Sequence, residues 1–229
     1  MIYSQRHGFV FVKTQKTAGT SIEVLLSGSV GPDDVVTPVE PPERGHEARN
    51  HAGRFLPIAE LRAGLPAGGA LRDLLAARRF YNHMPAALIR ARLPRGAWEH
   101  SFTFAVERNP WDKTLSRYRS VRARTGQLMP FDAFLRTRHF PIDHSLYTEP
   151  KDPRRIIVDR VIPYERLDEG LSEVLAQLGL PFEPPLAFRA KASAPVERPP
   201  YQEAYSPEQR DLVARAFAAE IELHGYTFD

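Results

Sequence analysis

The stretch GFVFVKTQKTAGTS, residues 8–21, determines the fold that the sequence predicts. Its first part, 8–12, is a short run rich in β-branched and aromatic residues, which is typical of a buried strand. After it, apolar side chains recur at helical spacing, at Ile22, Leu25 and Leu26. The stretch therefore predicts a strand, a loop over 13–17 and a helix over 18–26.

The same order of strand and helix returns later in the chain. Residues 101–106 predict a second strand and 110–122 the helix after it. Further strands are expected at 156–158, with a continuation toward residue 162, and at 79–82. The remaining helices are expected over 58–63, 70–79, 86–93, 167–178 and 207–224. This alternation predicts an α/β protein: a P-loop-like three-layer fold with a central, mostly parallel sheet flanked by helices. We expect one domain over 1–229, with a helical and irregular insertion at about 27–79.

Composition limits the classes of function. The 31 basic and 28 acidic residues nearly cancel, so bulk attraction to nucleic acid is not expected and anion binding must come from local charge. The absence of cysteine excludes disulfides, thiolate metal sites and a cysteine nucleophile, and it fits a cytoplasmic protein. No run approaches the ~18 apolar residues of a membrane-spanning helix, so we expect no membrane span.

The first candidate anion-binding segment, 13–21, lies where the first strand gives way to a helix. Unpaired backbone N–H groups and the helix dipole favour a phosphate-like group there. Small residues let an anion approach the backbone, hydroxyls add donors, and Lys16 adds a full charge. Lys16-Thr17 also resembles the end of a nucleoside-triphosphate P-loop, but positions 10–15 contain no glycine.

The second candidate segment, 108–116, repeats this arrangement. Arg108 follows the strand, and a guanidinium can bind a phosphate through two parallel hydrogen bonds. Pro110 is suited to the first helical position. Ser116 falls two turns into that helix, where its hydroxyl could reach a phosphate held by Arg108.

The two segments together resemble a known family. K-T-x-G-[ST]-[ST] after an N-terminal strand, followed about ninety residues later by R-N-P-W-[DE]-[RK]-x-x-S-x-Y, is similar to the PAPS-dependent sulfotransferases, in the branch of carbohydrate and heparan sulfate enzymes and bacterial relatives. The resemblance implies 3′-phosphoadenosine 5′-phosphosulfate (PAPS) as co-substrate and its bisphosphate (PAP) as product, without a metal. It implies that the 5′-phosphosulfate contacts the first segment, at Lys13, Lys16, Thr17, Ala18, Gly19, Thr20 and Ser21. It implies that the 3′-phosphate contacts Arg108 and Ser116.

Two positions depart from the family pattern. Lys113 stands where arginine is frequent, and Glu107 stands where an apolar residue is usual. A carboxylate at Glu107 would weaken phosphate binding unless it pairs with Arg108 or Lys113.

Sulfuryl transfer needs a base for the acceptor hydroxyl, and histidine has a suitable pKa of about 6.5. The resemblance implies that His83 is the base and that Lys16 stabilises the leaving phosphate. His51 and His144 are the competing histidines. Lys191 is expected to fold over the nucleotide. No spacing of His and carboxylate residues predicts a metal site.

Three functions remain open from the sequence. The first is sulfuryl transfer to an acceptor hydroxyl. The resemblance implies a carbohydrate as the acceptor, and the hydroxyls of a lipid, a peptide tyrosine or a small metabolite remain open. The second is a P-loop nucleotide kinase or NTPase, with Asp159 after an apolar run as its magnesium ligand. The third is a non-catalytic nucleotide- or polyanion-binding module that uses the basic helix over 113–124. The oligomeric state is not readable from the sequence.

Overall fold

The computed structural model describes residues 1–126, 128–186 and 199–229. Its main sheet has five strands in the order β3-β1-β2-β4-β7. In sequence order these are β1 (Ile2–Ser4), β2 (Phe9–Val12), β3 (Val35–Val36), β4 (Phe102–Glu107) and β7 (Arg160–Pro163). β2, β4 and β7 are parallel, and β1 is antiparallel to both of its neighbours. Four of the five strands therefore run in one direction.

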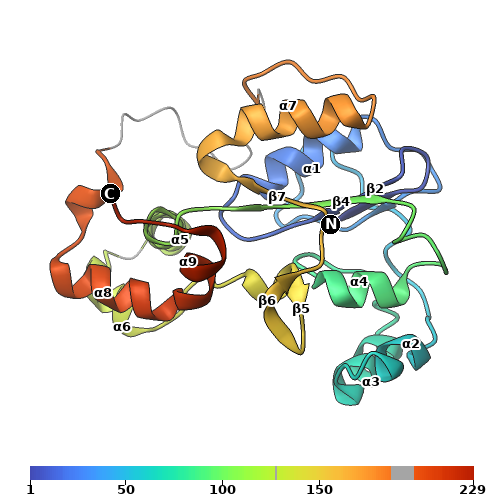
Figure 1. The fold of residues 1–229 in the computed structure, drawn as a ribbon, viewed down its shortest axis with the longest axis horizontal. Coiled ribbons are helices and arrows are strands. Elements are labelled where there is room, and N and C mark those ends of the chain that lie inside the picture. Colours follow the sequence, from blue (N-terminus) through green and yellow to red (C-terminus); the bar gives the residue numbers. More distant parts are fainter. Residues whose placement is uncertain (127, 187–198) are drawn as a thin grey trace.

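Helices cover both faces of this sheet (Figure 1). On one face α1 (Gly19–Ser27) and α7 (Leu167–Gln177) pack against the aromatic side chains of β2 and β4. On the other face α4 (Ala86–Arg92) packs against the valines of β2. Alternate residues of β2 enter opposite cores, which is why 8–12 reads as a continuous apolar run. The predicted α/β fold, a mostly parallel sheet between helical layers, is confirmed.

A third core lies beyond the end of β4. There α5 (Pro110–Thr125) packs with α6 (Phe131–Arg136), α8 (Pro207–Ala216) and α9 (Ala218–His224) around Trp111 and Phe217. Two short helices, α2 (Ile58–Arg62) and α3 (Ala67–Leu75), lie on the α4 side of the sheet (Figure 1). Within the described ranges, no helix is long and apolar enough to cross a membrane.

Some predicted elements are wrong in detail. Residues 152–156 form β6 (Asp152–Ile156), which pairs with β5 (Thr148–Glu149) in a separate two-stranded sheet, and the third parallel strand is β7. Residues 79–82 are no strand, although the Phe80 N–H donates to the carbonyl of His51 at 2.8 Å. The last helix divides at Phe217, whose φ of −107° interrupts the helical backbone.

Candidate functional site

The two predicted anion-binding segments meet at one edge of the sheet. β2 and β4 are adjacent parallel strands with Val12 opposite Ala105, so the segments that follow them leave the same edge. The Thr14 hydroxyl donates to the carbonyl of Val106. The Arg108 Nη1 donates to the carbonyl of Lys16 at 3.0 Å. The structure therefore brings 13–21 and the start of 108–116 into direct contact.

The backbone of the first segment is shaped to expose N–H groups. Lys16 and Ala18 both have left-handed φ angles, 61° and 59°. Ala18 is the N-cap residue of α1, and its side chain makes no capping hydrogen bond. Left-handed residues in a turn direct successive N–H groups to one side, which makes an anion-binding concavity. Together with the positive end of the helix dipole, this geometry suits a phosphate or sulfate group.

Part of the first segment has a structural role that the sequence did not predict. The Lys13 ammonium is buried, 2.6 Å from Glu23 Oε2, and it shares this carboxylate with the N-terminal ammonium of Met1 at 2.5 Å. A Cβ at Gly19 would lie 2.7 Å from the Lys13 Cγ, so glycine is needed there for packing against that side chain. The buried Thr17 hydroxyl is 2.8 Å from the Thr14 hydroxyl. Lys13 therefore has a structural role at the base of this segment, and its contact with an anion stays a prediction.

The remaining polar side chains at the start of α1 are Thr20 and Ser21. Thr20 is half-buried and Ser21 is buried, and both belong to the first turn of the helix.

Arg108 is held firmly in place. Its Nε and Nη2 donate to Asp112 Oδ2 at 2.9 and 2.6 Å, and its guanidinium lies 4.0 Å above the Tyr164 ring. With the contact to Lys16, these bonds engage three of the five guanidinium N–H groups. Ser116 is half-buried on α5, eight residues further along. The guanidinium is therefore oriented before any ligand binds.

The carboxylate of Glu107, which would repel a nearby anion, is paired with a cation. Its Oε1 accepts from the Lys113 ammonium at 2.6 Å and from the Arg108 backbone N–H at 2.8 Å. Burial raises the pKa of Glu107. Burial also opposes the charge on Lys113, but Glu107 and Asp143 outweigh it and hold the pKa of Lys113 above its ordinary value. The Lys113 ammonium thus neutralises the carboxylate that departs from the family pattern.

Asp143 extends this buried network to the first segment. It lies 2.9 Å from Lys113 Nζ and accepts from the backbone N–H and the side-chain amide of Gln15, at 2.5 and 3.0 Å. On the other side of Glu107, Oε2 accepts from the Tyr147 hydroxyl at 2.9 Å, which is also 2.9 Å from His224 Nε2. The sequence did not single out Asp143, Tyr147 or His224 for this role. Asp143 is recognisable only through its distant partners.

His83 lies beside the first segment. Its Nδ1 is 3.1 Å from the carbonyl of Lys13. A carbonyl only accepts, so Nδ1 carries the hydrogen and Nε2 carries the lone pair of the neutral ring. Burial, followed by the charge of Lys13, lowers the pKa of His83 to about 4. The ring is therefore neutral at pH 7 and presents a proton acceptor.

The competing histidines have other surroundings. His51 lies beside the segment that leads to His83, through the backbone bond to Phe80. The His144 Nδ1 is 3.2 Å from Glu220 Oε1. Lys191 lies outside the described residues.

The magnesium ligand of the P-loop alternative is in the wrong place. Asp159 Oδ2 accepts from the backbone N–H and hydroxyl of Thr103, at 2.7 and 2.8 Å. Both residues lie at the amino ends of β7 and β4, the opposite sheet edge from Lys16 and Arg108. Among the described residues, no group of three or more His and carboxylate side chains is arranged to hold a metal ion.

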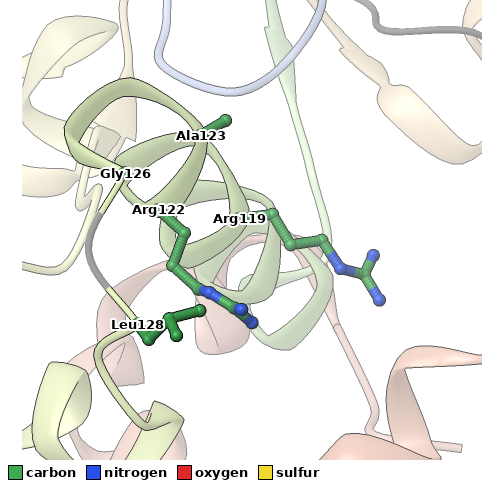
Figure 2. Close-up of a pocket in the computed structure, with 5 residues that line it drawn as sticks. All are labelled: Arg119, Arg122, Ala123, Gly126 and Leu128. Carbon is green, nitrogen blue, oxygen red and sulfur yellow. The ribbon is translucent and has the colours of Figure 1, made fainter.

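The basic helix α5 has an open hollow near its end (Figure 2). This hollow, of about 280 Å³, is lined by Arg119, Arg122, Ala123, Gly126 and Leu128. The Arg122 guanidinium lies 5.5 Å from the Tyr118 ring centre. Arg119 follows Ser116 by about one helical turn, so this basic surface adjoins the second predicted anion-binding segment.

Comparison with known proteins gives a relative by sequence and similar solved structures. A protein of Archaeoglobus fulgidus described as uncharacterized is 32% identical over 103 residues, which are 44% of this chain and 86% of that protein. No protein-family model matches the chain. A crystal structure of a sulfotransferase from Alicyclobacillus acidocaldarius has a TM-score of 0.47, 15% identity and 96% coverage of both chains. A likeness of that extent carries no argument about activity.

Proposed function

We propose that this chain, which belongs to the same family as the uncharacterized Archaeoglobus fulgidus protein, is a sulfotransferase that uses PAPS and sulfates a hydroxyl group. The contact between Arg108 Nη1 and the Lys16 carbonyl carries the proposal, because it joins the two anion-binding segments. Two such segments side by side suit a nucleotide with two separate phosphate groups better than a single phosphate chain.

The donor is proposed to place its 5′-phosphosulfate over the start of α1. The turned backbone at Lys16 and Ala18 and the uncapped helix start supply N–H groups, and Lys16 supplies charge. Thr20 and Ser21 add hydroxyls. The 3′-phosphate is proposed to contact Arg108 and Ser116, with Asp112 and Tyr164 orienting the guanidinium.

The transfer step follows from these positions. The acceptor hydroxyl gives its proton to His83 Nε2 while its oxygen bonds to sulfur. The bond between sulfur and the 5′-phosphate oxygen breaks, and Lys16 with the α1 amides stabilises the charge that develops there. A pKa of about 4 makes His83 a weak base, but the negative charge of a bound donor would raise it toward neutrality.

A carbohydrate is the proposed acceptor, on the family resemblance. The proposal is tested by incubating the protein with ³⁵S-labelled PAPS and a library of hydroxyl acceptors, and by identifying the sulfated product by mass spectrometry. His83→Ala is expected to lower the turnover at least ~100-fold with little change in PAP affinity, because general base catalysis contributes about 10²–10⁴-fold. Lys16→Ala is expected to lower both the turnover and the affinity for PAP.

His100→Ala is the matched control, since the His100 Nδ1 also contacts a backbone carbonyl, that of Gly96 at 2.6 Å, but the ring is exposed. Near-normal turnover of His83→Ala would exclude His83 as the base. PAP binding without a sulfated product from any acceptor would favour a binding module instead. Magnesium-dependent ATP hydrolysis would favour the P-loop alternative.

A further inference from the structure

The helical pair α2–α3, with the residues that flank it (54–79), presents an unusual surface. Five large apolar side chains are exposed within this short segment, at Leu56, Ile58, Leu61, Leu71 and Leu75. Leu56 and Leu75 are 79% and 80% exposed. Scattered exposed leucines are ordinary, but a group of this kind marks an interaction surface.

The exposed charges of the same segment all have one sign. Arg54, Arg62, Arg72 and Arg78 are exposed, and every carboxylate of 54–79 is buried. Those carboxylates are Glu60 and Asp73, and Arg92 on α4 holds both, with Nε 2.6 Å from Glu60 and Nη2 2.9 Å from Asp73. Arg78 and Arg72 also pair with Asp73, at 2.5 and 3.7 Å, while their exposed side chains remain on the outer surface. The pairing with Arg92 docks the helices on the protein and removes negative charge from their outer face.

The helical geometry groups the exposed apolar side chains of α2 and of α3 in pairs. Leu71 and Leu75 are four residues apart on α3, and Ile58 and Leu61 are three apart on α2, so each pair shares a face. On the same helices Ala70, Asp73 and Glu60 are buried. A Cβ at Gly64 would lie 2.7 Å from the Lys151 ammonium, so a further cation from the β5–β6 hairpin adjoins the surface. Figure 1 shows α2 and α3 at the periphery, away from α5 and the C-terminal helices.

We infer that the α2–α3 surface docks on an anionic lipid bilayer. The leucines and isoleucine would enter the boundary between headgroups and acyl chains, while the arginines and Lys151 contact lipid phosphates. Charge complementarity favours this occupant. A second copy of the same face would bring arginines against arginines with no exposed carboxylate to receive them, and a nucleic acid would leave the apolar side chains without a partner.

The test is co-sedimentation of the protein with vesicles of phosphatidylcholine containing 30% phosphatidylglycerol, compared with vesicles of phosphatidylcholine alone. We expect partition onto the anionic vesicles that weakens with salt. The double variant Arg54→Gln, Arg62→Gln is expected to lower the partition coefficient about 25-fold, because each arginine near such a surface contributes about fivefold. Leu71→Asp with Leu75→Asp is expected to lower it by about tenfold or more.

Matched controls lie elsewhere on the surface. Arg136→Gln with Arg215→Gln removes the same charge, and Leu128→Asp replaces an exposed leucine outside α2–α3. We expect both controls to partition like the unmodified protein. Circular dichroism at each variant's working concentration checks that the fold is retained.

Three outcomes would overturn the inference. The first is an absence of partition onto anionic vesicles, and the second is equal losses in the α2–α3 variants and the controls. The third is that the protein binds a second copy of itself or an acidic protein instead of vesicles, and that the α2–α3 substitutions abolish this binding. None of these readouts depends on sulfuryl transfer.

Discussion

Half of the unusual backbone conformations lie at the proposed site. Among the described residues, six non-glycine residues have φ near +50° to +60°, and three of them, Lys16, Ala18 and His83, lie around the start of α1. Such conformations cost about 1 kcal/mol or more each, and they persist where the surroundings impose them. The strain is consistent with a site shaped for a ligand rather than for stability.

The buried ring of His83 predicts a dependence of stability on pH. Its pKa is about 4 in the folded protein and about 6.5 in an unfolded chain. Between these values the unfolded chain binds more protons, so the free energy of unfolding falls as pH falls through this window, by at most about 3 kcal/mol. His83→Gln is expected to remove this part of the pH dependence. Denaturant unfolding at pH 7 and pH 4.5 measures the change in unfolding free energy between the two pH values, with His100→Gln as control. An equal change in the unmodified protein, His83→Gln and His100→Gln would contradict the assignment.

Close packing between helix and sheet depends on single small residues. α7 crosses β7 at Gly170, where an added Cβ would clash with the buried side chain of Ile162. A glycine inside a helix ordinarily costs about 1 kcal/mol relative to alanine. Here the contact with the sheet requires it.

Gly170→Ala is therefore expected to destabilise the protein by about 1–3 kcal/mol, in spite of the better helix propensity of alanine. Gly69→Ala in α3 is the matched control, because no atom of the described residues lies within 4 Å of its added Cβ. The control is expected to be neutral or slightly stabilising. Thermal or denaturant unfolding of both variants gives the comparison, and an equal effect in the two would refute the packing argument.

At the scale of the whole molecule, one buried polar network links distant parts of the chain. Lys113 on α5 pairs with Glu107 at the end of β4 and with Asp143, which binds Gln15 of the first segment. Through Tyr147, Glu107 is also linked to His224 on the C-terminal helix α9. Lys113 is its central cation and is fully buried. The network fixes the relation between the two segments that are proposed to bind anions.

Lys113→Met is expected to cost about 3–5 kcal/mol of unfolding free energy, because two carboxylates lose their counter-charge in the interior. Adding Glu107→Gln is expected to recover part of the loss. Arg136→Met, at an exposed ion pair with Asp132, is expected to change stability by less than about 0.5 kcal/mol. Denaturant unfolding measures all three, and a loss below about 1 kcal/mol in Lys113→Met would show that the network is not stabilising.

Local patterns explain which elements could be predicted. Apolar runs predict β2 and β4, and helical spacing predicts α1 and α5, with Pro110 at the start of α5. Each of these signals spans only a few consecutive residues of the sequence. β1, β3 and α6 were missed because each is short and buries its residues only against distant neighbours. The strand expected at 156–158 was displaced to β7, since Asp159 turns the chain onto Thr103 before the sheet is entered.

By itself the sequence determined the α/β fold and two segments suited to anions, because strand, loop and helix signals are local. Only the tertiary structure decided that these segments touch through Arg108 and Lys16. It also decided that Lys13 pairs with Glu23, which Met1 shares, and that Glu107 pairs with Lys113, which Asp143 shares. The physical reason is that the strength of a charge depends on its burial and its partners. Those are fixed by residues far away in the chain, so the stretch at 8–21 predicts the frame of the site but not which of its cations can bind a ligand.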